Sequence, residues 1–88
     1  MIQFALGQLV ITAGAEDVLQ ADEAVAMIRR HLTGDFGDMD AHDRRINYDE
    51  MRSGGRVLSR YKAASGDIIY VITEQWRGVT TILLPEEY

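Results

Sequence analysis

The residues with the greatest chemical potential lie in one stretch, HLTGDFGDMDAHD, at positions 31 to 43. It combines two histidines with four aspartates, the side chains that bind divalent metals and act as general acids and bases. A calcium-binding loop that begins at Asp38 is excluded by its spacing. Asp43 stands where that loop needs a glycine, and Asp49 stands where it needs a bidentate glutamate.

A zinc or iron site would require His31, Asp35 and His42 to converge, and no pair of histidines on adjacent helix turns enforces this. No serine stands in a nucleophile-elbow context. We therefore predict a protein that is not an enzyme, with no catalytic residue, no metal ligand and no cofactor. A small hydrolase or metal-dependent enzyme built around His31 and Asp35 remains the minor alternative.

The same stretch is also typical of a helix end followed by an acidic surface. His31 suits the last turn of a helix, where positive charge faces free carbonyl groups, and Gly34 suits the turn that follows. Several aspartates would not be buried together, since unpaired like charges are costly in a low dielectric. We predict that the following side chains bind a protein partner: Asp35, Asp38, Asp40, Asp43, Asp49, Glu50 and, at the tip of a predicted hairpin, Trp76.

The net charge of −5 is concentrated in residues 35–50, which carry six acids and two arginines. A chain of this sign is not expected to bind nucleic acid directly, and its acidic middle suits a basic protein surface or simply keeps the protein in solution. Positive charge gathers on a predicted strand, where Arg56, Arg60 and Lys62 share one face. That face favours an alternative function, the binding of nucleic acid or of a regulator, or it protects a sheet edge.

The 88 residues are predicted to form one small α+β domain, residues 1–88. Cysteine is absent, which removes disulfides and thiolate catalysis and favours a reducing cytoplasm. No apolar run reaches the roughly 18 residues that a membrane span needs. A core of this size leaves a homodimer open as a source of further burial.

These side chains must be positioned by helices and strands that the sequence also predicts. Residues 4–12 are apolar and β-branched, which indicates a strand, and residues 13–20 indicate a short helix or helical turn. The next helix is expected to begin at an Asp22 cap and to end at Gly34. Its apolar stripe, which we expect to face the core, consists of Ala21, Ala24, Val25, Ile28 and Leu32.

A second helix is expected to begin at Asp38 or Asp40 and to place Ile46 and Met51 inward, with Phe36 buried beneath the preceding turn. Three strands joined by short hairpin links follow, at residues 56–62, 67–74 and 79–84. The predicted fold is α+β, with a four-stranded antiparallel sheet and two or three helices on one face. The sheet combines the N-terminal strand with a C-terminal three-stranded meander.

The order of these motifs resembles a family of short accessory proteins encoded on plasmids, phages and other mobile elements. The family pattern has a helix that ends in histidine, then GDWG, an aspartate and an asparagine, a G-R…S-Y strand, ITE..R..TT and a final LLP.EY. The chain meets this pattern over most of its length with His31, GDFG at 34–37, Asp43, Asn47, Gly55, Arg56, Ser59, Tyr61, ITE at 72–74, Arg77, Thr80, Thr81 and LLPEEY at 83–88. Phe36 stands where the family has tryptophan, and Trp76 stands where it has a small charged residue.

Some small acidic proteins of such elements are anti-CRISPR proteins, and the resemblance implies that this chain is one. It implies an inhibitor in the host bacterial cytoplasm that binds a type I CRISPR interference complex. Such complexes hold nucleic acid in channels rich in lysine and arginine, so an acidic surface would mimic DNA and exclude the target. The pattern residues could instead have a purely structural role. In that alternative Asp35, Glu74, Arg77 and Thr81 form a buried network that fixes the turn after the His31 helix to the sheet.

Overall fold

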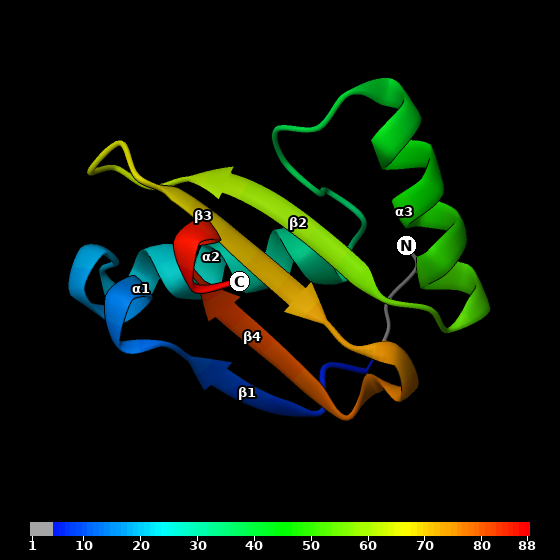
Figure 1. The fold of residues 1–88 in the computed structure, drawn as a ribbon, viewed down its shortest axis with the longest axis horizontal. Coiled ribbons are helices and arrows are strands. Elements are labelled where there is room, and N and C mark those ends of the chain that lie inside the picture. Colours follow the sequence, from blue (N-terminus) through cyan, green and yellow to red (C-terminus); the bar gives the residue numbers. More distant parts are fainter. Residues whose placement is uncertain (1–4) are drawn as a thin grey trace.

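A computed structural model describes residues 5–88 of the chain. It confirms the α+β class: a four-stranded sheet with the order β1-β4-β3-β2 is accompanied by three α helices in the described residues (Figure 1). The strands are β1 (Gln8–Ile11), β2 (Val57–Lys62), β3 (Ile68–Thr73) and β4 (Val79–Leu83). The helices are α1 (Ala13–Val18), α2 (Ala21–Leu32) and α3 (Ala41–Ser53), and single 3₁₀ turns occupy Gln75–Arg77 and Pro85–Glu87.

The sheet is mixed, which corrects the prediction of a fully antiparallel sheet. β2, β3 and β4 form the predicted antiparallel meander, because short hairpin links force each strand to reverse direction. β1 instead pairs with β4 in parallel, with Leu9 beside Thr80 and Ile11 beside Ile82. No hairpin joins these two strands, so the helices between them allow either direction.

Helix α2 lies behind the sheet in the view of Figure 1 and covers one of its faces, and α1 lies at the left, where its Ala15 joins the same apolar cluster as Met27 of α2. The buried residues of α2 are Met27 and His31, with Ile28 half-buried, whereas Val25 is 50 % exposed. The packing face of α2 is therefore rotated from the predicted stripe toward His31. The sequence pattern treats a histidine as polar, but the sheet supplies hydroxyl partners that allow this one to be buried.

The ends of α2 follow local rules with one correction. Its N-terminal cap is Gln20, in a reciprocal capping box with Glu23, and not the predicted Asp22. At the other end Gly34, with φ +86°, adopts the left-handed conformation predicted for it. The Asp35 amide donates to the Arg30 carbonyl at 2.9 Å, which completes a Schellman turn.

Of the two predicted caps, Asp38 and Asp40, it is Asp40 that begins helix α3, and its carboxylate accepts a hydrogen bond from the Asp43 amide at 2.8 Å. Met51 and Phe36 are buried as predicted and form a second apolar cluster with Val57. The prediction that Ile46 faces inward was wrong, since its side chain is 49 % exposed. Figure 1 shows the reason: α3 lies beside β2 and does not cover a sheet face, so only a narrow stripe of the helix is buried.

No helix within residues 5–88 has the length and apolar character needed to cross a membrane. The predicted first strand begins at residue 4, which lies outside the described residues, and β1 occupies the later part of that prediction.

Candidate functional site

His31 lies in the core, where a chain of hydroxyl groups surrounds it. Its side chain is 0 % exposed, and its Nδ1 lies 2.6 Å from Ser59 Oγ and its Nε2 lies 2.8 Å from Thr73 Oγ1. Thr73 Oγ1 lies 2.7 Å from Thr80 Oγ1, which donates to the carbonyl oxygen of Leu6 at 2.7 Å. One continuous line of hydrogen bonds therefore crosses the sheet from β2 to the segment before β1.

The end of this line determines the direction of every bond in it. The Thr80 hydroxyl has one hydrogen and gives it to a carbonyl, so it must accept from Thr73. Thr73 then has no hydrogen left for His31, so Nε2 of the imidazole must carry the proton and donate. In a neutral ring Nδ1 then carries no hydrogen, so it accepts from the Ser59 hydroxyl. For a neutral ring, the geometry thus selects the Nε2–H tautomer.

Burial, together with a smaller effect of the nearby positive charge of Arg77, lowers the pKa of His31 from 6.5 to about 4. The ring is neutral at pH 7 and does not act as the charged helix end that the sequence predicted. The Ser59–His31 pair has the spacing of a nucleophile and its base, but both side chains are 0 % exposed, so no substrate reaches them.

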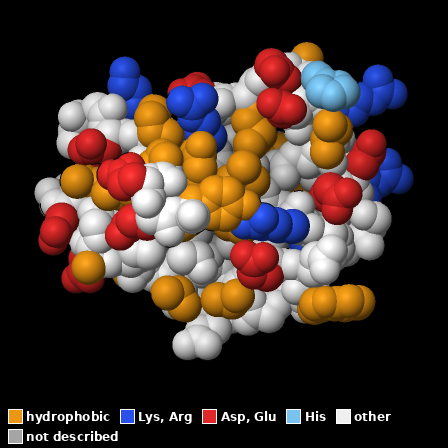
Figure 2. Space-filling view, viewed as in Figure 1, with side chains coloured by type: hydrophobic (Ala, Val, Ile, Leu, Met, Phe, Trp, Pro, Cys, Tyr) orange, Lys and Arg blue, Asp and Glu red, His pale blue; other side chains and the backbone are white. Residues whose placement is uncertain are grey.

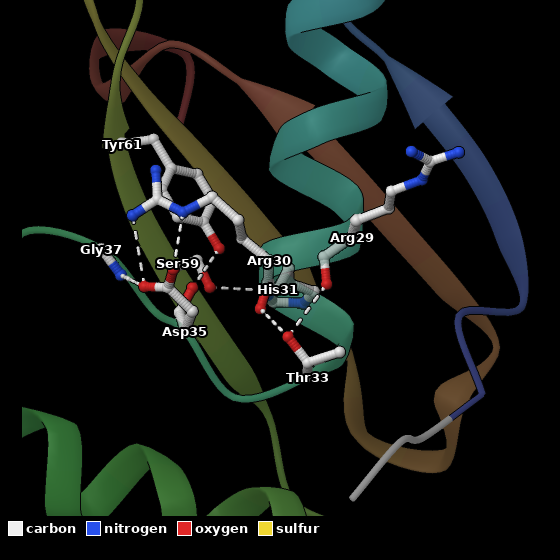
Figure 3. Close-up of polar contacts among 8 residues, drawn as sticks. All are labelled: Arg29, Arg30, His31, Thr33, Asp35, Gly37, Ser59 and Tyr61. Atoms are coloured by element: carbon white, nitrogen blue, oxygen red, sulfur yellow. Dashed lines mark hydrogen bonds and ion pairs between the residues drawn. The ribbon is translucent and has the colours of Figure 1, made fainter. Parts of the chain in front are cut away.

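Asp35, one of the predicted partner-binding residues, is paired within the chain (Figure 3). Arg30 donates to both of its carboxylate oxygens, through Nε at 2.7 Å and Nη2 at 3.2 Å. This bond to Arg30 lowers the pKa of Asp35. The Arg30 guanidinium also lies 4.5 Å from the centre of the Tyr61 ring, whose hydroxyl donates to the Asp35 carbonyl at 2.6 Å. Asp35 therefore joins the end of α2 to β2 and contributes little free negative charge.

The segment after Asp35 runs along the outer edge of β2. Arg60 donates its amide to the Phe36 carbonyl at 2.9 Å and accepts from the Asp38 amide at 2.7 Å. Gly37, between them at φ +79°, passes so close that a Cβ would lie 2.0 Å from the Arg60 carbonyl oxygen. Next along the strand, the Asn47 side chain donates to the Leu58 carbonyl at 2.7 Å and accepts from its amide at 2.8 Å. The segment predicted to present an acidic surface therefore covers the outer edge of β2.

Only part of the predicted acidic set forms one surface. Asp40 is used as the cap of α3, and Asp38 is exposed next to it. Asp49 lies on a different side of α3 from Asp43 and Glu50, which are seven residues apart and share a face. Asp43 and Glu50 border a groove of about 340 Å³ whose lining also includes Met39, Ile46, Asn47, Arg56 and Leu58.

This groove combines carboxylates with an apolar floor, as Figure 2 shows where orange side chains lie between red ones near α3. The two ion pairs found within residues 5–88 are Arg30–Asp35 and Arg56–Glu74, so neither Asp43 nor Glu50 belongs to one. Helix α3 also carries three arginines, which equal its three acids in number: Arg44, Arg45 and Arg52. The helix is therefore not acidic as a whole, and only its groove side combines acids with apolar groups.

Trp76 stands at the tip of the β3–β4 hairpin as predicted, and its side chain is 89 % exposed. Its backbone has φ +72°, which is rare for a bulky residue. Arg77 holds this loop against the last turn of α3, because its guanidinium donates to the carbonyls of Gly55 and, at 2.8 Å, Met51. The hairpin tip is therefore fixed near the C-terminal end of α3, and Trp76, the residue before Arg77, projects into solvent there.

The predicted basic stripe is divided in the structure. Arg60 and Lys62 are exposed on β2. Arg56 precedes that strand, lies 3.5 Å from a carboxylate oxygen of Glu74 and stacks 4.7 Å from the centre of the Tyr88 ring.

No family model, curated protein or solved structure matches this chain. The expected network of Asp35, Glu74, Arg77 and Thr81 does not exist as one unit, because the first three contact Arg30, Arg56 and the end of α3 respectively. The buried network is instead that of His31. Sequence reasoning missed it, although alternate residues at 57–61 and 71–73 would place Ser59 and Thr73 on inward faces.

Within residues 5–88, no three His, Cys, Asp or Glu side chains are grouped so that they could hold a metal ion. The two members of the minor enzymatic alternative are also engaged elsewhere: His31 uses both ring nitrogens in hydrogen bonds, and Asp35 is bound by Arg30.

Proposed function

We propose that this protein is a non-enzymatic inhibitor that binds a basic surface of a partner protein through the groove between α3 and β2. The observation that supports this best is the position of Asp43 and Glu50, two exposed carboxylates beside an apolar floor. A partner that fits offers lysine or arginine next to an apolar side chain. Neither carboxylate forms an ion pair within the described residues, so binding would break none of their salt bridges.

The magnitudes favour this mixed surface over a purely electrostatic one. An exposed ion pair contributes about 0–1 kcal/mol and is weakened by salt, so two carboxylates alone do not produce a stable complex. Burial of an apolar side chain adds about 1.5–3 kcal/mol. Ile46, which is 49 % exposed, and Trp76, which is 89 % exposed, supply apolar groups at the floor and at one end. Tryptophan is also enriched among residues whose loss costs an interface most.

Together with the family resemblance, this surface leads us to propose an anti-CRISPR protein that acts in the cytoplasm of a bacterial host. Its partner is a lysine- and arginine-rich surface of a type I CRISPR interference complex, and its binding excludes target DNA by occupying that surface. The partner-binding residues we propose are Asp38, Asp43, Glu50 and Trp76. Asp35 and Asp40 support this surface from within the chain: Asp35 joins the end of α2 to β2, and Asp40 caps α3.

The test is reversal of three carboxylates, Asp38→Lys, Asp43→Lys and Glu50→Lys, in one variant. Asp40 is left intact, because its loss would remove the cap of α3. We expect this variant to lose inhibition of target-DNA binding by a reconstituted type I complex, while its circular dichroism spectrum remains that of the native protein. Inhibition by the native protein should weaken as salt rises.

A matched control carries the same change of charge on another part of the surface, with Glu16→Lys, Asp17→Lys and Asp22→Lys around α1 and the start of α2. All three residues are exposed. This control should inhibit like the native protein. If both variants inhibit fully, or if both fail equally, the groove is not the binding surface.

Arg60 and Lys62 provide a second candidate function, because both are exposed on β2 and Arg60 lies beside Tyr70 on β3. A cation next to an aromatic ring suits a nucleic-acid backbone with a stacked base. We propose this alternative only if the isolated protein binds DNA or RNA at moderate salt and loses that binding in the variant Arg60→Ala, Lys62→Ala.

A further inference from the structure

The two edges of the sheet differ in how far the rest of the chain covers them. The β2 edge is covered by Asn47 and by residues 36–38, and it also carries the exposed charges of Arg60 and Lys62. The β1 edge has none of these features. In Figure 1, β1 forms the lower margin of the sheet, and no other helix or strand of the described chain runs along its outer side.

The backbone amide and carbonyl groups that could pair β1 with a further strand are exposed. Gln8 donates its amide to the Gly78 carbonyl at 3.0 Å, and Thr12 donates to Ile82 at 3.0 Å. In a parallel ladder alternate residues bond to the neighbouring strand, so the amide and carbonyl groups of Leu9 and Ile11 point away from β4. Natural edge strands are protected by charge, proline or a bulge, and the sequence QLVI of β1 contains no charged residue and no proline.

An apolar surface continues from this edge onto α2. A groove of about 250 Å³ lies between them, lined by Leu9, Ala24, Val25, Ile28, Arg29 and Ile82. Leu9 is 52 % exposed and Val25 is 50 % exposed. Figure 3 shows that Arg29 points from α2 toward β1 on this side. The free strand edge and the exposed helix face therefore belong to one continuous surface.

We propose that a second copy of this chain pairs with β1 in antiparallel orientation, which makes one eight-stranded sheet across a two-fold axis. This inference does not depend on the proposed function. The axis passes between the Val10 residues of the two subunits, so that Leu9 lies opposite the partner subunit's Ile11. This register forms four hydrogen bonds, because Leu9 and the partner subunit's Ile11 exchange two and the symmetric pair exchanges two more.

Two arguments favour a second copy over an unrelated strand. The first is charge: each chain carries −5, yet β1 carries no charge, so its antiparallel pairing brings no like charges together within the strands. The second is area. A stable interface needs about 800 Å² on each side, about 15 % of the 5313 Å² surface of the described chain. One strand of four residues does not supply this area, and a second copy adds an equally apolar α2 face beside its own β1.

The register is tested with two single variants and their mixture. Leu9→Lys and Ile11→Glu each place a charge opposite an apolar residue twice in the symmetric dimer. Each variant should therefore weaken self-association at least about tenfold. Mixed in equal amounts, they should form a heterodimer, because one Leu9→Lys side chain then faces one Ile11→Glu side chain. Sedimentation velocity separates the 9.9 kDa monomer from a dimer of twice that mass.

The matched control is Ile46→Lys, which adds the same charge at an apolar residue that is 49 % exposed on α3. It should leave the dimer unchanged, and thermal melts should show that all variants are folded. A native protein that stays monomeric at about 100 µM overturns the proposal. So does a dimer that responds to Ile46→Lys and not to the β1 variants, or a mixture that associates no better than its components.

Discussion

The buried His31 should make the stability of this protein depend on pH well above the range in which carboxylates titrate. Its pKa is about 4 in the folded chain against an ordinary value of 6.5. Between these two values the unfolded chain binds a proton at this residue that the folded chain does not. The free energy of unfolding must therefore be highest above about pH 6.5 and must decrease as pH falls toward 4.

The size of the effect follows from these two values. From 6.5 to about 4, at about 1.4 kcal/mol per pH unit, the total loss is about 3 kcal/mol. About 2 kcal/mol of this loss falls between pH 7 and pH 5. That window lies above the ordinary pKa of Asp and Glu, and the carboxyl groups of Glu23, Asp35 and Glu87 have pKa values lowered further. Their contribution is lost only below that window.

The assay is urea unfolding followed by circular dichroism at pH 7, 6 and 5. The variant His31→Gln keeps a neutral donor and acceptor in the core, so it should remove most of the slope between pH 7 and 5. The variant His42→Gln changes the other histidine, which is exposed on α3, and should keep the slope of the native protein. If the native protein and His31→Gln show the same pH dependence, the buried neutral imidazole is not its cause.

Two further predictions concern the edge of the sheet and the hairpin tip. Asn47→Ala leaves the amide and carbonyl of Leu58 without a partner in a half-buried position. Urea unfolding should show that the free energy of unfolding falls by about 2 kcal/mol. A fall below about 0.5 kcal/mol would contradict the role of Asn47 in covering the edge of β2. Trp76→Gly relieves a left-handed backbone at φ +72° and removes an 89 % exposed side chain. Thermal and urea melts should show that the free energy of unfolding rises by about 1 kcal/mol, and partner binding should weaken. A loss of stability would mean that the indole is held by contacts within the chain.

Local interactions explain which parts of the fold could be predicted. Asp40 and Gly34 act at helix ends through bonds to residues at most a few positions away; Gly34 was predicted correctly, and Asp40 was one of the two caps predicted for α3. The three C-terminal strands alternate over short hairpins, so their boundaries and directions follow from residues close in sequence. The direction of β1 depends on β4, some 70 residues later, and no local pattern encodes it.

The candidate site was predicted less well, because the use of a charged side chain depends on distant neighbours. Asp35 looks like Asp38 in the sequence, yet only Asp35 lies within reach of Arg30 at the end of α2. His31 looks like a polar helix end, and its burial depends on hydroxyls that are 28 and 42 residues away. Sequence spacing therefore located the acidic segment but did not separate carboxylates that hold the fold from those that face solvent.

The residues that support the family resemblance are mostly those that hold this fold together. His31, Ser59 and Thr80 belong to the buried hydrogen-bond chain, Asn47 covers an edge, and Arg77 holds the hairpin against α3. Most pattern residues therefore use their polar groups within the chain, and the exposed carboxylate of Asp43 is an exception. Under the proposed function, exposed positions outside the pattern, such as Glu50 and Trp76, then distinguish one partner from another. Under the proposed function, a chain that keeps the pattern but differs at those positions should fold in the same way and inhibit a different complex, because most groups that contact the partner are not the groups that hold the sheet to its helices.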